Sequence, residues 1–322
     1  MSVANIDPEL RPQLEAVRSM ALDFSPVGLH QTRSLIRETI DSGALYRPKS
    51  VVVEDVAVPV LDDGSDLKLR IYRPRRSALP VPLLYWMHGG GMVVGSFDMD
   101  DNLLVNAVER LGIAAASVEY RLAPEHPDPV PVEDCYAGLS WIAAGAAAYG
   151  IDPLRIAVGG VSAGGGLAAG AALLARDRSG PPLRFQLLLE PMLDDRAITY
   201  SSTAYDESTI WNRNDNRSGW TALLGSRIGT DDVSPYAAPA RATELAGLPP
   251  AFLDVGEVET FRDEVIDYAR RLLVAGISTE FHVYPGAFHG FDLLAPDSTL
   301  AGRAWRSRWE ALARAFGLRY ES

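Results

Sequence analysis

The stretch "VGGVSAGGG", residues 158–166, places five glycines around one serine and decides how the rest of the sequence is interpreted. Glycine loses more backbone freedom on folding than any other residue, so ordering such a run is costly and needs a reason. The apolar stretch "RIAVGG" precedes Ser162, and the helix-forming stretch "AGGGLAAGAALLARD" follows it. Ser162 therefore lies where a predicted strand ends and a predicted helix begins.

The pentapeptide around Ser162 has the pattern G-x-S-x-G, with Gly160 and Gly164 at its ends. In this pattern the turn is so sharp that side chains at the two glycine positions would collide, and the serine hydroxyl projects at the carboxyl end of the sheet. The following helix N-terminus directs free N–H groups toward developing negative charge. A glycine-rich turn or a phosphate loop is the alternative, but no Walker lysine follows and G-x-G-x-x-G fits poorly. We predict that Ser162 is a nucleophile.

Strands and helices alternate along most of the chain on either side of this turn. The stretches "VVVEDVAVPV" and "LKLRIY", separated by "DDGSD", predict an antiparallel hairpin. The stretch "VPLLYWM" is almost continuously apolar, as in a strand that is buried on both faces. The alternation after it predicts an α/β fold with a mainly parallel, doubly wound sheet.

Two segments stand outside this alternation. Residues 1–45 have a helical pattern and precede the first strand, and residues 191–247 form a polar excursion that contains Trp211. We expect both segments to form a helical cap, with Trp211 at the mouth of the substrate pocket. Residues 46–190 and 248–322 then form the two parts of the α/β core.

Composition limits the classes of partner. The formal net charge of -12 argues against nucleic acid or an anionic membrane surface as the main partner. The sequence has neither an apolar run long enough to span a bilayer nor a secretory signal pattern, so we expect a cytoplasmic protein without stable membrane insertion. One cysteine, Cys135, and five scattered histidines predict no intramolecular disulfide and no metal site of the Cys/His type. A serine nucleophile implies no cofactor and no metal.

A serine hydroxyl needs a base to act as a nucleophile near neutral pH. His289, in "YPGAFHGF", follows a predicted strand and lies on a loop near the carboxyl end of the sheet. The positions of the other histidines suggest a helix surface for His30, a loop for His126 and a strand interior for His282. His88 belongs to the glycine-rich stretch "WMHGGGM". We predict that His289 is the base.

The stretch His88-Gly89-Gly90-Gly91 comes just after a predicted strand and well before Ser162. It matches the oxyanion loop of lipases and esterases, in which glycines let backbone N–H groups face a carbonyl oxygen. With the N–H of Ala163, such groups would stabilise a tetrahedral oxyanion, by about 3 to 4 kcal/mol per donor in a well-studied hydrolase.

The carboxylate that orients the histidine has four candidates in "AFLDVGEVETFRDE". Asp254 lies inside the apolar strand, too early to reach the site. Asp263 begins the next helix, where a carboxylate has an ordinary role at the N-terminus. The loop between them leaves Glu257 and Glu259.

Four motifs, in the order "HGGGM", "YRLAPEHP", "GVSAGGG" and "YPGAFHGF", resemble those of the hormone-sensitive-lipase-like family of α/β-hydrolases over nearly the whole chain. The resemblance implies a carboxylic ester hydrolase with Ser162 and His289 in its catalytic triad. It also implies an oxyanion hole made by the N–H groups of Gly90, Gly91 and Ala163, and a cap over the site.

The sequence departs from the family pattern at two places. The acid motif, commonly D-P-L-R-D-E, is "ETFRDE" here, so the resemblance places the triad acid on Glu259. We expect an ordinary glutamate pKa of about 4.3, which keeps this carboxylate ionised near neutral pH. The residue after HGGG, often aromatic in relatives, is Met92, whose flexible side chain is expected to widen one wall of the substrate pocket.

By analogy with the family, we expect an esterase that acts on short- to medium-chain esters through an acyl-enzyme. An amidase or acyltransferase could use the same triad. A non-catalytic ligand-binding protein on a hydrolase scaffold is a further alternative, which the presence of His289 disfavours. The strand "TEFHVYP" is expected near one edge of the sheet, where an exposed edge invites pairing in a homodimer.

Overall fold

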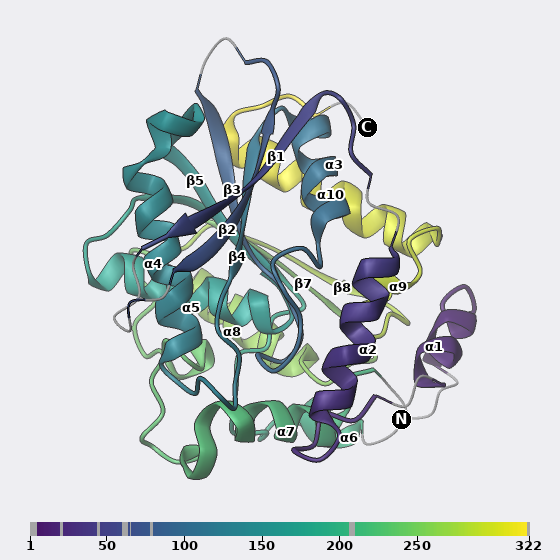
Figure 1. Ribbon diagram of the computed structural model, residues 1–322. Helices are drawn as coiled ribbons and strands as arrows, with labels where there is room; N and C mark the ends of the chain where they lie inside the picture. Colours follow the sequence, from purple (N-terminus) through teal and green to yellow (C-terminus); the bar gives the residue numbers. More distant parts are fainter. Residues whose placement is uncertain are drawn as a thin grey trace.

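Eight strands form one sheet in the computed structural model, which describes residues 5–19, 22–43, 46–59, 64, 66–77, 80–205 and 210–320 (Figure 1). The strands are β1 (Val51–Val58), β2 (Leu67–Pro74), β3 (Val81–Met87), β4 (Ala114–Glu119), β5 (Ile151–Val161), β6 (Leu183–Leu189), β7 (Ala251–Gly256) and β8 (Thr279–Tyr284). Their order across the sheet is β1-β2-β4-β3-β5-β6-β7-β8. The pairs β1–β2 and β2–β4 are antiparallel and the other pairs are parallel, so the prediction of a mainly parallel α/β sheet is confirmed.

Helices cover both faces of the sheet. The longer helices are α2 (Leu29–Ser42), α3 (Asp101–Leu111), α4 (Val130–Ala144), α5 (Ala163–Asp177), α7 (Arg213–Leu224), α8 (Arg262–Val274) and α10 (Thr299–Phe316). The shorter ones are α1 (Arg11–Arg18), α6 (Tyr200–Ala204) and α9 (Phe291–Leu294). Side chains of α4, α5 and α8 pack in one hydrophobic core, and those of α3 and α10 pack in a second.

Strand β3 shows why its sequence is almost continuously apolar. Tyr85 and Met87 pack in the core that contains α4 and α5, whereas Leu84 and Trp86 pack in the core that contains α3 and α10. Successive side chains of a strand point to opposite faces, so both faces of a central strand must be apolar when helices cover each side.

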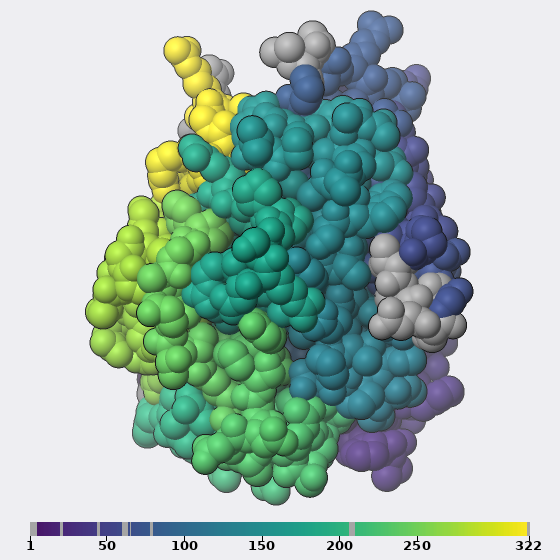
Figure 2. Space-filling model, turned by 90° about the vertical axis from the view of Figure 1, so that its left-hand side faces the viewer, coloured from purple at the N-terminus to yellow at the C-terminus, as the bar shows by residue number. Residues whose placement is uncertain are grey.

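The segments that precede and interrupt the core lie at one end of the molecule. Helices α2, α6 and α7 gather in the lower part of Figure 1, and α1 lies at the right of that view. From the side, the green residues of the excursion lie next to purple N-terminal residues at that same end (Figure 2). Residues 1–4, 20–21, 44–45 and 206–209 of the predicted cap lie outside the described residues.

Strand β8 is the last strand of the sheet, as the sequence predicts for "TEFHVYP". Among the described residues, no helix has both the length and the apolar character needed to cross a membrane.

Candidate active site

The serine of the G-x-S-x-G motif lies at the sharp turn between β5 and α5. Ser162 has φ 58° and ψ -123°, a backbone conformation that L-residues rarely adopt. Its N–H donates to the carbonyl oxygen of Leu189, 2.8 Å away. A Cβ at Gly160 would overlap the carbonyl group of Gly164, and a Cβ at Gly164 would overlap the carbonyl oxygen of Met87. Both glycines are therefore required for the chain to make this turn.

A chain of hydrogen bonds runs from this serine through a histidine to a glutamate. His289 Nε2 lies 2.9 Å from Ser162 Oγ, and His289 Nδ1 lies 3.2 Å from Glu259 Oε1. When Glu259 is ionised it can only accept, which assigns the proton of the neutral ring to Nδ1. Nε2 is then free to accept the proton of the serine hydroxyl.

The loops that carry His289 and Glu259 are held to one another. The N–H of Val258 donates to the carbonyl oxygen of Ala287 at 2.8 Å, which joins the loop after β7 to the loop after β8. The N–H of Gly256 donates to Glu259 Oε2 at 2.9 Å. A Cβ at Gly256 would lie only 2.5 Å from the carbonyl oxygen of Ala287, so the close approach of the two loops depends on this glycine.

The two aspartates that the sequence disfavours as the triad acid have other partners. Asp254 accepts a hydrogen bond from buried Arg308 at 2.6 Å. Asp263 accepts the N–H of Ser201 at 2.8 Å, close to the start of α8. Neither carboxylate is a hydrogen-bond partner of the histidine.

Glu257 and Glu259, the two glutamates of the loop after β7, also have different hydrogen-bond partners. Glu257 Oε2 accepts the N–H of Gly286 at 2.9 Å and supports the loop that leads to His289. Glu259 contacts the imidazole itself. Of the four carboxylates considered from sequence, the structure brings Glu259 to the histidine.

A second carboxylate, which the sequence analysis missed, also lies beside the imidazole. Glu190 Oε2 is 3.2 Å from His289 Nδ1 and accepts the N–H of Gly290 at 2.6 Å. Glu190 follows β6 directly, next in the sheet to the strand that leads to Ser162. The available sequence signal was an acidic residue at the carboxyl end of the apolar strand "FQLLLEP".

Burial governs the protonation of this group of side chains. Ser162 and His289 are only 6% and 8% exposed, and Glu190 and Glu259 are fully buried. Desolvation lowers the pKa of His289, which favours the neutral ring. Desolvation raises the pKa of both Glu259 and Glu190 above the usual range of a glutamate, and the charge of Glu259 adds to the effect on Glu190. The expectation of an ordinary pKa for Glu259 is therefore wrong.

The glycine-rich loop after β3 makes a tight turn beside Ser162. Gly90 has φ 110° and Gly91 has φ 62°, and a Cβ at Gly90 would overlap the backbone of Val94. Ala163 is the first residue of α5, where N–H groups precede the first helical hydrogen bond and have no partner within the helix. The three predicted oxyanion donors thus lie on the two turns that flank the serine.

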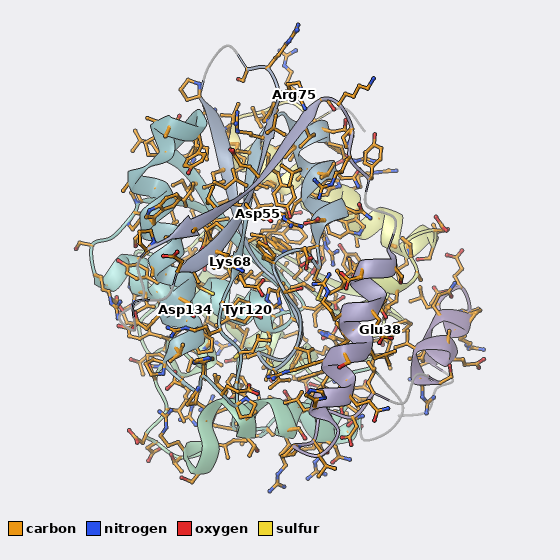
Figure 3. The ribbon with its side chains drawn as sticks, viewed as in Figure 1. Glu38, Asp55, Lys68, Arg75, Tyr120 and Asp134 are labelled. Carbon is orange, nitrogen blue, oxygen red and sulfur yellow. The ribbon has the colours of Figure 1, made fainter. Side chains whose placement is uncertain are left out.

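Side chains behind the loop hold it in place. His88 is fully buried, and burial lowers its pKa to about 4, so its ring is neutral. The hydroxyl of Tyr120 donates to the carbonyl oxygen of His88 at 2.8 Å, and the two rings stack with centroids 4.2 Å apart. Arg121 then binds Asp134 of α4 at 2.8 Å, which anchors the "YRLAPEHP" segment after β4; Tyr120 and Asp134 are labelled in Figure 3.

Trp211 joins the excursion to this loop. Its ring lies against Gly91, where any Cβ would overlap it, and its carbonyl oxygen accepts the hydroxyl of Thr260 at 2.8 Å. Phe24, from the N-terminal segment, packs edge-on against the Trp211 ring at 5.0 Å between centroids. Trp211 therefore connects both predicted cap segments to the glycine-rich loop.

Met92 occupies a different environment. Its side chain is fully buried in the core that contains α4 and α5, and its carbonyl oxygen accepts the N–H of Ala123 at 2.9 Å. It is not exposed on a pocket surface in this conformation, so its contribution to the substrate pocket stays a prediction.

One cluster in the described part of the chain offers three closely spaced potential metal ligands. These are Glu190, Glu259 and His289, with one ligand atom of each within 4.8 Å of the others. Nδ1 of the imidazole, however, is already hydrogen-bonded to Glu259, and Nε2 faces Ser162. We therefore assign the cluster to hydrogen bonding and name no metal for it.

Comparison with known proteins places this geometry in a family. A model of the alpha/beta hydrolase fold matches residues 84–293, a span that contains the glycine-rich loop, Ser162, Glu259 and His289. The chain belongs to the α/β-hydrolase family. The predicted resemblance to hormone-sensitive-lipase-like α/β-hydrolases is thereby confirmed.

Several relatives of this α/β-hydrolase match over most of their length. Carboxylesterase NlhH of Mycobacterium tuberculosis is 35% identical over 314 residues, which cover 95% of this chain and 97% of the relative. Ethyl acetate hydrolase of Pseudomonas putida is 30% identical, with 89% of this chain and 92% of the relative covered. The solved structure of a bacterial heroin esterase is 42% identical with a TM-score of 0.90, covering 98% of this chain and 99% of the other.

Proposed function

We propose that this protein hydrolyses short- to medium-chain carboxylic esters through an acyl-enzyme on Ser162. Homology with esterases over most of the chain makes this protein a carboxylic ester hydrolase. The observation that supports an acyl-enzyme on Ser162 is the hydrogen-bonded chain from Ser162 through His289 to Glu259. A serine, an imidazole and an orienting carboxylate in this geometry are the parts that acyl transfer requires.

The reaction proceeds in two halves. His289 Nε2 accepts the hydroxyl proton as Ser162 Oγ bonds to the ester carbonyl carbon, and the N–H groups of Gly90, Gly91 and Ala163 stabilise the oxyanion. The imidazolium then gives its proton to the departing alcohol oxygen, which leaves an acyl-serine. A water, deprotonated by the same imidazole, attacks the acyl carbon and releases the carboxylic acid with the serine regenerated.

The substrate class is supported by the restricted access to the serine and by the relatives. Ser162 is 6% exposed, and the Trp211 ring packs against the neighbouring loop, which favours small acyl groups. The name ethyl acetate hydrolase describes a relative that acts on a small ester.

A panel of p-nitrophenyl esters of increasing acyl length tests this proposal. We expect the highest kcat/KM for the acetate and butyrate esters and a fall for long acyl chains, as judged by release of p-nitrophenolate. The matched anilide, p-nitroacetanilide, should be cleaved far more slowly. A preference for the anilide would favour an amidase, and fast transfer of the acyl group to an added alcohol would favour an acyltransferase.

We also propose that the N-terminal helices and the excursion act as a cap. Arg33 on α2 donates to the carbonyl oxygens of Val93 and Ala123, each at 2.7 Å, and pairs with Glu125 at 2.8 Å. These contacts fix α2 to the segment that continues the glycine-rich loop. Because two of these contacts are made to backbone oxygens, Arg33 positions the loop as well as the helix.

Deleting residues 1–40 is expected to abolish activity or cause aggregation while Ser162 stays chemically intact, because the deletion removes Arg33 and exposes the apolar surface under α2. Arg33→Ala should lower kcat/KM and thermal stability without removing the helix. Ser34→Ala is the control on the same helix, since this hydroxyl donates to the carbonyl oxygen of His30 in the preceding turn of α2. Unchanged kinetics of the truncated protein on both large and small esters would refute the cap.

β8 lies at the edge of the sheet, which supports a further proposal, a homodimer in which two copies pair through this strand. Light scattering at micromolar concentration should then give twice the monomer mass of 34.8 kDa, and a monomeric mass would contradict it.

A further inference from the structure

The imidazole of His289 faces two carboxylates with one N–H. Nδ1 is 3.2 Å from Glu259 Oε1 and also 3.2 Å from Glu190 Oε2. Only the contact with Glu259 has hydrogen-bond geometry. Glu190 Oε2, at the same distance from Nδ1, is therefore placed as an alternative acceptor for this N–H.

The backbone at Glu190 adopts a strained conformation. Its φ of 45° lies in the left-handed region, which is strained for a residue other than glycine. The Glu190 N–H donates to the carbonyl oxygen of Asp254 at 2.9 Å, and Pro191 follows it. The carboxylate also accepts the N–H of Gly290, the residue after the histidine, at 2.6 Å. The strained backbone thus directs Glu190 at both the ring and the loop of His289.

The surroundings contain more carboxylates than cations. The titratable and charged groups that act on Glu190 are Glu259 in the loop after β7, His289 in the loop after β8, Asp292 on α9 and Arg308 on α10. Asp254 on β7 lies beside them and pairs with Arg308 at 2.6 Å, and Arg308 also binds Asp292. The guanidinium is therefore already shared by two aspartates. Arg262 on α8, the cation that acts on Glu259, pairs with Asp263 at 2.8 Å. Both guanidiniums are thus paired with aspartates, and the two buried glutamates lack a full countercharge.

We propose that Glu190 is a second positioning carboxylate for His289, able to orient the imidazole when Glu259 cannot. The proposal rests on the proposed function, because the ring needs a fixed orientation only if it serves as the base for Ser162. The two carboxyl groups act as a pair that carries one negative charge near neutral pH, since two adjacent buried carboxylates cannot both ionise easily. One charge is sufficient to stabilise the imidazolium that forms in the reaction.

The presence of Glu190 beside Glu259 changes the loss of kcat that we expect when Glu259 alone is replaced. In a Ser-His-Asp protease, asparagine in place of the triad acid holds the wrong tautomer and lowers kcat by about 10⁴. In Glu259→Gln, the neutral neighbour lets Glu190 ionise, and this carboxylate still accepts the Nδ1 proton. The loss should therefore be about 10- to 100-fold rather than the full 10⁴ that the protease value suggests.

Kinetics of Glu190→Gln, Glu259→Gln and the double variant with p-nitrophenyl acetate test the pair. We expect a loss below about 10-fold for Glu190→Gln and a loss of about 10⁴ for the double variant, far above the product of the two single losses. Glu257→Gln is the matched control, because Glu257 also accepts an N–H from this loop but does not contact the ring. A Glu259→Gln variant as inactive as the double variant, or a Glu190→Gln variant as inactive as either, would overturn the proposal.

Thermal unfolding between pH 4 and pH 9 gives a readout that does not depend on activity. The raised pKa of Glu190 means that the folded protein holds a proton which the unfolded chain releases near pH 4.3. This group therefore lowers the free energy of unfolding as pH rises above that value. Glu190→Gln cannot titrate, so its Tm relative to the parent should rise with pH across this range. A constant difference in Tm would contradict the shared proton.

The experiment also separates this proposal from the function on which it rests. If the parent protein hydrolyses no ester, the proposed function fails, whereas the pH dependence of Tm still reports on Glu190. If the parent is active and Glu259→Gln loses as much kcat as the double variant, the proposed function stands and only the proposed role of Glu190 is refuted. A low-field proton resonance of His289 Nδ1–H that persists in Glu259→Gln and disappears in the double variant would support it directly.

Discussion

Ser162→Ala is expected to lower kcat for p-nitrophenyl acetate by about 10⁶-fold, as the loss of the nucleophile does in a well-studied serine hydrolase. The fold should persist, because alanine keeps the Cβ at the same strained φ of 58° and removes only one oxygen atom. Stopped-time assays at high enzyme concentration measure the residual rate, and circular dichroism checks the fold.

Ser140→Ala provides the control for this variant. The Ser140 hydroxyl donates to the carbonyl oxygen of Tyr136 within α4, so its loss should leave kcat unchanged. A Ser162→Ala protein that keeps more than about a hundredth of the parent kcat would show that another group carries the reaction.

His289→Ala is expected to have an effect of similar size, about 10⁶-fold in kcat, because the serine and its base act as a unit. Without the imidazole at 2.9 Å, the hydroxyl has no group to accept its proton. The pH profile gives a second test. Burial lowers the pKa of His289 from 6.5, so the acidic limb of kcat/KM in the parent should have its midpoint below pH 6.5.

His282→Ala controls for the loss of an imidazole elsewhere. His282 lies on β8 and contacts Glu280 at 2.9 Å, away from the serine. Its replacement should keep the acidic limb of the profile. If His289→Ala retained both that limb and measurable turnover, the assignment of the base would be wrong.

Local sequence predicts the fold well where the pattern of one element alone indicates which of its faces are buried. The apolar run of β3 predicted a strand covered on both faces, and Leu84 and Tyr85 do lie in opposite cores. The contacts of the N-terminal helices could not be predicted in this way. Arg33 binds the carbonyl oxygen of Val93, 60 residues away, and no periodicity of the sequence encodes such a pair.

In the candidate site, too, the features set by local sequence could be predicted, whereas those set by distant parts of the chain could not. The turn at Ser162 is local, and its steric requirement for Gly160 and Gly164 can be inferred from the pentapeptide alone. Glu190 was missed because its relation to His289 depends on the neighbouring order of β6, β7 and β8, and on a backbone φ of 45° that redirects its side chain. The raised pKa of Glu259 likewise arises from burial among other carboxylates, which the sequence does not display.

Treatment of the parent protein with a serine-reactive organophosphate, followed by peptide mapping, tests the proposed mechanism most directly. The proposal predicts that the protein hydrolyses p-nitrophenyl acetate, that one phosphoryl group is added per chain on Ser162, and that turnover falls in proportion to labelling. Turnover that survives complete labelling of Ser162, or inhibition that accompanies labelling of another residue, would contradict it.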